Sequence, residues 1–491
     1  MKKNIVVIGS GFSGLSTAVE LADNGAYVTV IEKNDTLGGR ARLFKEKGFT
    51  FDMGPSWYWM PEVFENFFEK YGKKVSDYYN LVRLDPSYRV IFGKNDYIDL
   101  PANLEELKKL FESLEEGSAE NLELFLEQAK YKYETGMNNF VHKPSVSLKE
   151  FIEPSVVSGL FKLDLLSSFH KHIRKFFKND KIIKIMEFPI LFLGATPQKT
   201  PAMYSLMNYA DIVLGTWYPL GGMFNIIDSM VNLAKDKGVE FVTNTEISEL
   251  EIKDNNIIKI KSKHKEFKPD VVVASADYNH VETKLLPKDS QSYSEEYWNK
   301  RIMSPSSLLF YLGINKKLKN LEHHNLFFDT DFSIHAKEIY ETPVWPSQPL
   351  FYVSVPSKTD STVAPENNEN VFILIPVAPN LEDTEQIREK YYNIVMDRLE
   401  DITGQRIREN VIFKRSYAHK DFKKDYNAFK GNAYGLANTL NQTAILKPSI
   451  KSKKVNNLFY TGQLTVPGPG VPPSIISGQV VAKQVISEFF N

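Results

Sequence analysis

The strongest constraint on the fold of this chain is a glycine-rich turn close to its start. Four apolar residues, 5–8, precede Gly9, Gly11 and Gly14, which follow the spacing Gly-x-Gly-x-x-Gly. This pattern is typical of a buried strand that turns tightly into a helix, whose N-terminus faces a pyrophosphate. The three glycines allow the tight turn, the close approach of the phosphates and the packing of helix on strand. We therefore predict a dinucleotide-type cradle, with a helix from Ser13 to about Asn24.

A second strand with an acid at its end strengthens this interpretation. Residues 27–31 are strand-like, and Glu32 follows at roughly the 20-residue distance where an acid accepts hydrogen bonds from ribose hydroxyls. The next segment, 37–40, adds paired glycines and an arginine, whose planar guanidinium suits phosphate. A turn without a ligand is the alternative for the glycines alone. The residues assigned here to the cofactor are Gly9, Gly11, Phe12, Ser13, Gly14, Glu32, Lys33, Gly38, Gly39 and Arg40.

Composition narrows the class of protein. The 491 residues suffice for two or three domains, and a net charge of −1 gives no electrostatic bias toward nucleic acid. The chain has no cysteine, which excludes disulfides, thiolate metal sites, iron–sulfur clusters and a cysteine nucleophile. No stretch approaches the about 18 apolar residues of a membrane-spanning helix. We expect a cytoplasmic protein that meets membranes only peripherally.

Cofactor-type signals recur in three separate parts of the chain. They occupy 1–75, 218–285 and 425–491, and we interpret them as one discontinuous, Rossmann-like α/β domain for the cofactor. Within the cofactor domain, residues 238–247 predict one alternating strand. Residues 76–100 and 286–424 carry strand-like runs, among them 307–313, 350–355 and 371–376, and predict a mixed-sheet substrate domain. Residues 101–217 are helical in pattern and predict a cap. Further residues assigned to the cofactor in these segments are Gly54, Pro55, Ser56, Ile247, Gly462, Gly470, Val471 and Pro472.

Several longer motifs resemble one family along essentially the whole chain. The segments 48–56, 192–197, 217–222, 359–366 and 425–431 look like the bacterial phytoene desaturase family of carotenoid biosynthesis. Segment 37–40 resembles a motif that this family shares with amine oxidases and prenyl-protein chaperones. The resemblance implies an FAD-dependent desaturase of a C40 polyene, with phytoene as the first choice of substrate and oxygen or a membrane quinone as electron acceptor. Only one full glycine fingerprint is present, so no second dinucleotide domain is expected.

Three other functions share parts of this pattern. A later-acting carotenoid desaturase or a carotenoid isomerase would carry the same motifs, and product analysis would separate it. An FAD amine oxidase is related, although segment 359–366 resembles the carotenoid enzymes. A non-enzymatic prenyl-protein carrier would need no flavin, so a colourless purified protein would favour it.

The substrate side of the site is less well defined. A C40 hydrocarbon left in water costs about 0.8 kcal/mol per CH₂, so we expect an apolar tunnel that takes it from lipid. Glu150 is the candidate acid or base, because family members have an acid in a similar segment with a basic residue three positions later. Here position 153 is glutamate, so a paired mechanism lacks its cation, and helix capping is the alternative role. The tunnel candidates are Trp57, Tyr58, Trp59, Phe192 and Tyr204, with ordinary core as the alternative.

A basic and apolar segment, residues 161–178, is the candidate membrane surface. Such a mixture is typical of a helix in a lipid interface, while a solvated cap helix has the same composition. Lys171, Arg174 and Lys175 are its candidate lipid contacts. His170 and His172 are two residues apart and do not share a helix face, so no metal site is predicted. The expected partners are therefore the C40 carotenoid, a lipid surface and an electron acceptor, without nucleic acid.

Overall fold

A five-stranded parallel sheet forms the part of the molecule that contains the glycine turn. The computed structural model describes residues 2–147 and 167–490. The strand order is β19-β13-β1-β2-β9, and in the centre Val6 pairs with Val272 on one side and Thr29 on the other. Strands from three distant parts of the chain thus form one sheet, which confirms the predicted discontinuous α/β fold. The strands are β1 (Asn4–Ile8), β2 (Tyr27–Ile31), β9 (Glu240–Val242), β13 (Val271–Ala274) and β19 (Leu458–Tyr460).

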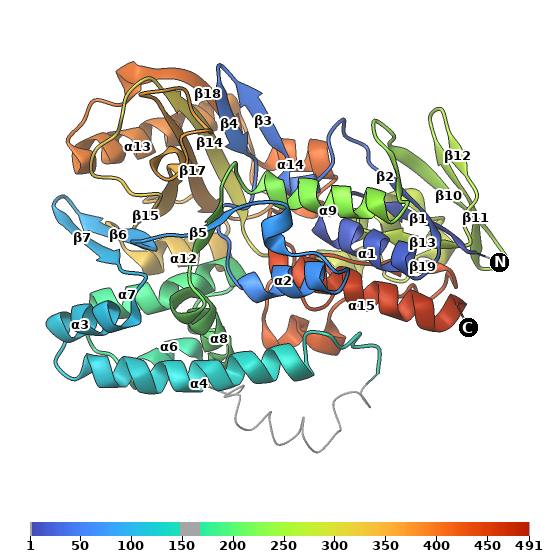
Figure 1. Cartoon of the computed structure of the whole chain (residues 1–491), viewed down its shortest axis with the longest axis horizontal. Coiled ribbons are helices and arrows are strands. Elements are labelled where there is room, and N and C mark those ends of the chain that lie inside the picture. The colour runs from blue at the N-terminus through green and yellow to red at the C-terminus, as the bar shows by residue number, and fades with distance from the viewer. Residues whose placement is uncertain (1, 148–166, 491) are drawn as a thin grey trace.

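Three helices pack together beside this sheet (Figure 1). Helix α1 (Phe12–Asp23) contacts both α9 (Phe224–Asp236) and α15 (Val471–Phe489). The contact between α1 and α15 is close enough that a Cβ on Gly478 would lie 2.4 Å from the Ser13 carbonyl oxygen. A small antiparallel sheet of β10 (Ile247–Lys253), β11 (Asn256–Ser262) and β12 (Glu266–Phe267) adjoins the parallel one.

A seven-stranded sheet forms the second large part of the molecule. Its order is β18-β14-β17-β16-β15-β6-β7, and all neighbours are antiparallel except the pair β15 and β6. All of β14 and nearly all of β17 are buried. One face of these strands shares a core with α13 (Glu385–Thr403), and the other face belongs to the core that reaches the cofactor part. The strands are β6 (Tyr88–Gly93), β7 (Asp96–Leu100), β14 (Ser306–Ile314), β15 (His324–Phe327), β16 (Phe351–Ser354), β17 (Glu369–Val377) and β18 (Val411–Tyr417).

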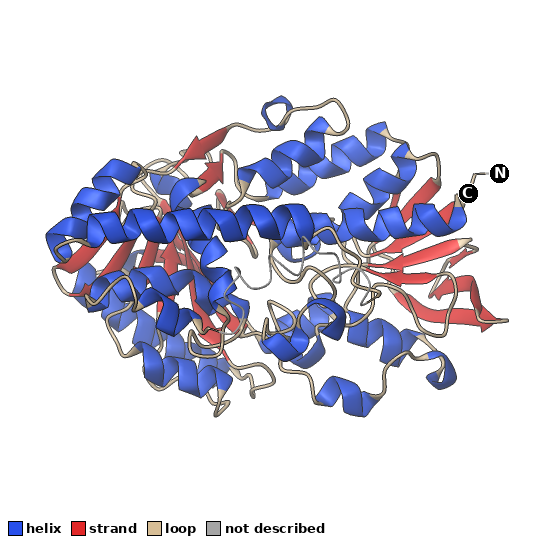
Figure 2. Cartoon of the chain, turned by 90° about the horizontal axis from the view of Figure 1, so that it is seen from below, coloured by secondary structure: helices blue, strands red, loops and turns tan. Residues whose placement is uncertain are grey.

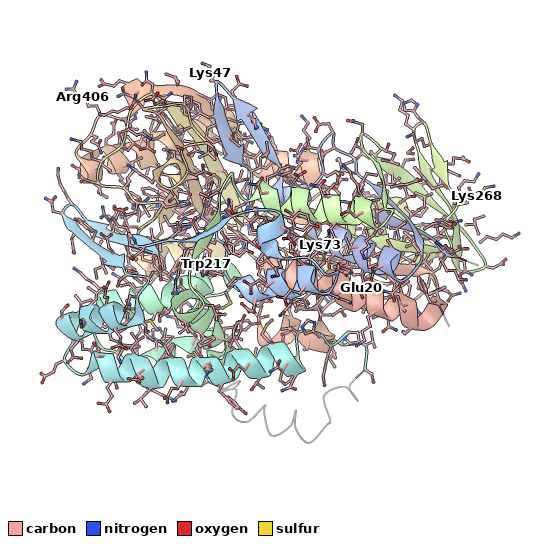
Figure 3. All side chains as sticks on the ribbon, viewed as in Figure 1. Glu20, Lys47, Lys73, Trp217, Lys268 and Arg406 are labelled. Carbon is pink, nitrogen blue, oxygen red and sulfur yellow. The ribbon has the colours of Figure 1, made fainter. Side chains whose placement is uncertain are left out.

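A group of helices lies below the seven-stranded sheet in the view of Figure 1. The longest of them, α4 (Ser118–Asn139), runs from below the seven-stranded sheet toward the cofactor part (Figures 1 and 2). Trp217 of β8 (Trp217–Pro219) lies at the junction of these helices and the sheets (Figure 3). Other helices here are α3 (Leu104–Leu114), α6 (Phe169–Ile173), α7 (Asp180–Glu187) and α8 (Leu206–Asn208).

Shorter elements complete the fold. Strand β5 (Leu81–Arg83) pairs with β8, and β3 (Leu43–Glu46) pairs with β4 (Phe49–Asp52). Helix α2 (Pro61–Glu69) packs against α15. The domain boundaries themselves stay a prediction. The remaining helices are α10 (Tyr278–His280), α11 (Glu295–Asn299), α12 (Phe332–Tyr340) and α14 (His419–Tyr426).

Two local predictions were wrong. Residues 238–247 do not form one strand, because β9 belongs to the parallel sheet and β10 begins a different sheet at Ile247. The described part of segment 161–178 holds only the five-residue helix α6 instead of a helix that continues to Lys178. Its apolar residues Phe169, Ile173 and Phe177 are buried in the protein core, so they are not available to lipid. Within the described ranges, no helix has both the length and the apolar character needed to span a bilayer.

Candidate functional site

One cavity of about 680 Å³ extends from the glycine turn to the seven-stranded sheet. At one end its wall is polar and glycine-rich, and at the other it is largely aromatic and aliphatic. Most of the residues proposed from the sequence lie in this wall. Those at the polar end are Gly9, Gly11, Phe12, Ser13, Glu32, Lys33, Gly38, Gly39, Arg40, Gly54, Pro55, Ser56, Ile247, Gly462, Gly470, Val471 and Pro472.

The turn after β1 leaves space where a phosphate would lie. A Cβ added to Gly11 would meet no atom within 4 Å, and Gly11 lines the cavity. Gly14 serves packing instead, since a Cβ there would lie 2.2 Å from the Gly9 carbonyl oxygen. Gly14 is therefore behind the turn and not part of the cavity wall.

Glu32 is fixed in position by its neighbours at the end of β2. One carboxylate oxygen accepts from the Ser10 amide at 3.1 Å and the Ser10 hydroxyl at 2.7 Å. The other accepts from the backbone and side-chain nitrogens of Asn34 at 2.9 and 3.0 Å. A carboxylate has about four acceptor positions, so a ribose bound here would replace one of these donors. Beside it, the Lys33 ammonium lies 3.1 Å from Glu246.

Arg40 contributes positive charge to the polar end of the cavity. Its guanidinium lies 5.1 Å from the centre of the Tyr426 ring and donates to the Asn432 carbonyl at 3.4 Å. Its Nε is buried and has no hydrogen-bond partner in the described structure. Burial lowers the pKa of Arg40, and the nearby Asp277 carboxylate opposes this effect. A buried guanidinium nitrogen without an acceptor fits a site that a phosphate completes.

Helix α15 begins at the cavity but presents few hydrogen-bond donors. Gly470 is the residue before the helix, with a φ of 118°. Pro472 and Pro473 follow Val471 and have no N–H group, while the Ser474 amide is already bonded to the Gly470 carbonyl at 3.0 Å. Only the amides of Gly470 and Val471 therefore remain for a ligand, fewer than a typical helix N-terminus provides.

The other end of the cavity is an aromatic chamber. Trp57 stacks on His324 with ring centres 4.1 Å apart and also packs against Trp59 and Tyr352. The Tyr352 hydroxyl and His324 Nδ1 are 2.6 Å apart. Burial lowers the pKa of His324 well below its usual range, which favours the neutral form of the ring. The chamber wall includes Trp57, Trp59, Tyr133, Gly136, Met137, Met203, Tyr204, Met207, Leu309, Tyr352, Phe372, Leu374 and Tyr434.

A buried carboxyl group holds Trp59 in this wall. Trp59 Nε1 donates to the Thr216 hydroxyl at 2.8 Å, and Thr216 donates to Asp211 at 3.2 Å. Tyr88 donates to the other Asp211 oxygen at 2.7 Å. Burial raises the pKa of Asp211 to about 7, and the two hydroxyl donors oppose this shift. No cation contributes to the shift, so the network depends on hydrogen bonds to a poorly solvated carboxyl group.

We expect Asp211→Asn to change the pH dependence of stability. Because the folded-state pKa of Asp211 is about 7 and its ordinary value is 3.8, the folded protein binds the proton more strongly between these values. The wild type should therefore lose stability relative to the variant as pH rises from 4 to 7, by up to about 1.4 kcal/mol per pH unit. Melting temperatures of both proteins across this range test this, and a constant difference would contradict it.

Four of the proposed residues are not in the described cavity wall. Tyr58 was wrongly placed in the tunnel: its ring stacks on Phe64 at 4.3 Å and its hydroxyl pairs with Tyr79 at 2.9 Å. Alternation along the chain turns Tyr58 into the core while Trp57 and Trp59 face the cavity. Gly14 lies behind the turn, as described above. Glu150 and the side chain of Phe192 lie outside the described part of the structure.

Sequence reasoning missed several residues of the wall. Asp425 and Tyr426 lie in segment 425–431, for which the sequence indicated only a family resemblance. In the structure, Asp425 pairs with Arg42 at 2.7 Å and Tyr426 faces Arg40. Tyr352 lines the cavity, and His324 contacts it from a separate strand without lining the wall, so no local spacing joined the two. Asn438 also lines the cavity, from a loop without a recognisable pattern.

The donor set of the polar end fits FAD. Gly11 leaves its side of the wall open, Arg40 has an unpaired nitrogen, and Glu32 stands at the ribose position of a parallel-sheet cradle. The residues that would hold FAD are thus the turn after β1, segment 32–40 and the start of α15. When bound, FAD would supply the electron acceptor for the oxidation of a substrate.

Comparison with known proteins agrees with this fold. Residues 12–486 match the family model described as flavin-containing amine oxidoreductase. The chain is 40% identical over 488 residues to the carotenoid 3,4-desaturase of Haloarcula japonica, covering 99% of this chain and 98% of that protein. It is 29% identical to the zeta-carotene-forming phytoene desaturase of Myxococcus xanthus, covering 99% and 94%. An oxidoreductase structure from Methanosarcina mazei has the same fold, with a TM-score of 0.65, 17% identity and coverage of 98% and 100%.

The parallel sheet, the glycine turn and the cavity define an FAD-dependent oxidoreductase, and the matching family model agrees with this. Within this class, the chain belongs to the carotenoid desaturase family. Both the cofactor and the family expected from the sequence motifs are confirmed.

Proposed function

We propose that this enzyme desaturates an acyclic C40 carotenoid. The observation that carries the proposal is the largely apolar chamber that continues directly from the FAD cradle, lined by residues such as Trp57, Leu309, Phe372 and Leu374. A long hydrocarbon gains about 0.8 kcal/mol per CH₂ that enters such a space from water. A cofactor that accepts hydride beside an apolar chamber suits the oxidation of a hydrocarbon without a charged group.

Phytoene is the first candidate substrate, and a carotenoid that is still saturated at the 3,4-bond is the second. The identity of 40% to a carotenoid 3,4-desaturase, against 29% to a phytoene desaturase, favours testing the second candidate equally. Each carotenoid would be supplied in liposomes, phytoene in one assay and lycopene in another, under air or without oxygen and with a quinone. Chromatography of the products then identifies substrate, number of steps and acceptor.

Different results distinguish the candidate functions. Longer conjugation with either substrate supports the proposal, and the oxygen-free arm shows whether a quinone replaces oxygen. A yellow flavoprotein that oxidises amines but neither carotenoid would favour the amine oxidase alternative. A colourless protein that binds prenylated proteins would favour the carrier.

We also propose that the enzyme takes its substrate from a lipid surface, since a C40 hydrocarbon resides in lipid. The burial of Phe169, Ile173 and Phe177 means that α6 offers only charge to such a surface. Arg174 is already bonded to Glu187 at 2.6 Å, whereas Lys171 and Lys175 are exposed. Co-sedimentation with anionic liposomes, repeated with Lys171→Glu and Lys175→Glu, tests whether this face contributes.

We propose that Tyr352 and His324 receive the proton that desaturation releases. Desaturation removes one hydrogen from each of two neighbouring carbons. Bound FAD would supply the acceptor for one of them as a hydride, and the other would leave as a proton while the C=C bond forms. Tyr352 Oη can take this proton while its own passes to His324 Nδ1, 2.6 Å away. Tyr352 faces the chamber, and His324 Nδ1 is its hydrogen-bond partner. Because burial lowers the pKa of His324 well below its usual range, His324 would hold this proton only transiently.

Replacing Tyr352 with phenylalanine should therefore lower turnover more than binding. We expect kcat on the carotenoid that the wild type converts to fall by about 100-fold, with a normal KM and full FAD content. The matched control is Tyr391→Phe, because that buried hydroxyl donates to the Pro346 carbonyl at 2.6 Å and lies in α13. Equal kcat values for the two variants would rule out this role for Tyr352.

A further inference from the structure

Lys447 is a buried cation close to the cofactor cavity. Lys447 is only 4% exposed, and its Nζ donates a hydrogen bond to Asn438 Oδ1 at 3.2 Å. Across the described residues, no carboxylate forms an ion pair with it. Burial alone lowers the pKa of Lys447 to about 8, with no contribution from a neighbouring charge.

Such an arrangement is costly without a negative partner. An ammonium withdrawn from water into protein loses several kcal/mol of solvation, and buried charges are normally paired for this reason. An amide oxygen returns only part of this loss. The missing partner must therefore come from something that the protein binds, or else the amine is held in a neutral form.

The position of Lys447 indicates where that partner would lie. Asn438 and Gly468 both line the cavity, and a Cβ on Gly468 would come within 3.2 Å of the Lys447 Nζ. Glycine at 468 thus leaves room for the ammonium beside the cavity wall. The same loop includes Thr443, which faces Tyr204 of the aromatic chamber. This corner therefore adjoins the chamber, where the reacting part of the cofactor must meet its substrate.

The neighbouring helix cannot supply the positive charge by itself. Pro472 and Pro473 remove two of the N–H groups that the start of α15 would otherwise present. Arg40 already serves the opposite, glycine-rich part of the cavity, where the pyrophosphate would lie. Of the start of α15, Arg40 and Lys447, only Lys447 therefore places a full positive charge on the chamber side.

We propose that Lys447 stabilises the negative charge that the flavin ring gains on reduction, and so raises the electron affinity of the bound FAD. FAD carries extra negative charge in its pyrimidine portion when reduced, and a fixed cation in a poorly solvated site interacts strongly with it. The inference rests on FAD binding and does not depend on which carotenoid is the substrate.

The test compares Lys447→Met, Lys447→Arg and Lys451→Met in the purified FAD-loaded protein. Lys451 is the matched control, since it is close in sequence but pairs with Glu488 at the surface. The measurements are FAD affinity, the flavin midpoint potential and the affinity for sulfite, which adds to electron-poor flavins. For Lys447→Met we expect normal FAD content and sulfite binding that is weaker by about tenfold. A tenfold loss in the reduction equilibrium corresponds to a fall of about 30 mV for a two-electron couple.

Each outcome decides the proposal. If Lys447→Arg has the midpoint potential and the sulfite affinity of the wild type, and Lys451→Met also leaves them unchanged, the positive charge itself is responsible. An unchanged potential and unchanged sulfite affinity in Lys447→Met would overturn the inference. Weaker FAD binding at an unchanged potential would also overturn it, because the cation would then serve the pyrophosphate. If Lys447→Met does not fold, the same measurements are made on Lys447→Gln, which removes the charge but keeps a polar group next to Asn438.

Discussion

Gly11→Val is expected to give a folded protein that purifies without FAD. A Cβ at Gly11 would meet no protein atom within 4 Å, so the valine can be accommodated by the chain itself. Its methyl groups would instead occupy the part of the cavity next to the phosphate-binding turn. Overpacking there should weaken FAD binding by at least about 100-fold. The visible absorption spectrum and the melting temperature of the purified variant measure the two effects separately.

Two further glycine variants serve as controls for this prediction. Gly93→Val also adds a side chain in open space, but in β6 away from the cavity, and should keep its flavin. Gly14→Ala should damage the fold, because its Cβ would lie 2.2 Å from the Gly9 carbonyl oxygen. A Gly11→Val protein with a normal flavin spectrum would remove this turn from the proposed cofactor site.

Gly136→Phe is expected to block the substrate chamber while leaving FAD in place. Gly136 lies in α4 and lines the aromatic chamber, and a Cβ there would be 3.8 Å from a Leu206 methyl group. An aromatic ring in this position has to extend into space that a C40 chain would fill. We expect kcat/KM on the carotenoid converted by the wild type to fall by roughly 100-fold.

The size of the added side chain should determine the loss. Gly136→Ala makes only an ordinary van der Waals contact with Leu206 and favours the helix, so its kcat/KM should fall far less than that of the phenylalanine variant. Flavin content provides the control for an intact cradle. Equal rates for the alanine and phenylalanine variants would show that the substrate does not pass α4.

The cofactor side of this protein could be predicted because its signals are local. The turn, the helix and Glu32 all lie within about one βαβ unit, where residue spacing fixes geometry. The structure places α1 at Phe12–Asp23 and β2 at Tyr27–Ile31, within a residue of the expected helix and strand. The strand runs at 307–313, 350–355 and 371–376 likewise correspond to β14, β16 and β17.

The chamber could not be predicted in the same way, because it is assembled from distant segments. Tyr352 and His324 meet through the pairing of β15 with β16, and Trp57 reaches His324 from the cofactor part. Asp211, Thr216 and Trp59 form their network over 157 positions of sequence. For segment 161–178, composition suggested one amphipathic helix, whereas the burial of Phe169 and Ile173 is a tertiary effect.

The strand order also has a consequence for how this protein is made. Val272 of β13 pairs with Leu458 of β19. The outer edge of β13 therefore has no partner until the ribosome has synthesised more than 180 further residues. During that interval the growing chain carries an unpaired and apolar strand edge, which is a template for aggregation. Premature termination before β19 would leave this edge permanently open. Chaperone demand and the yield of expressed fragments should therefore depend on whether residues 458–460 are included.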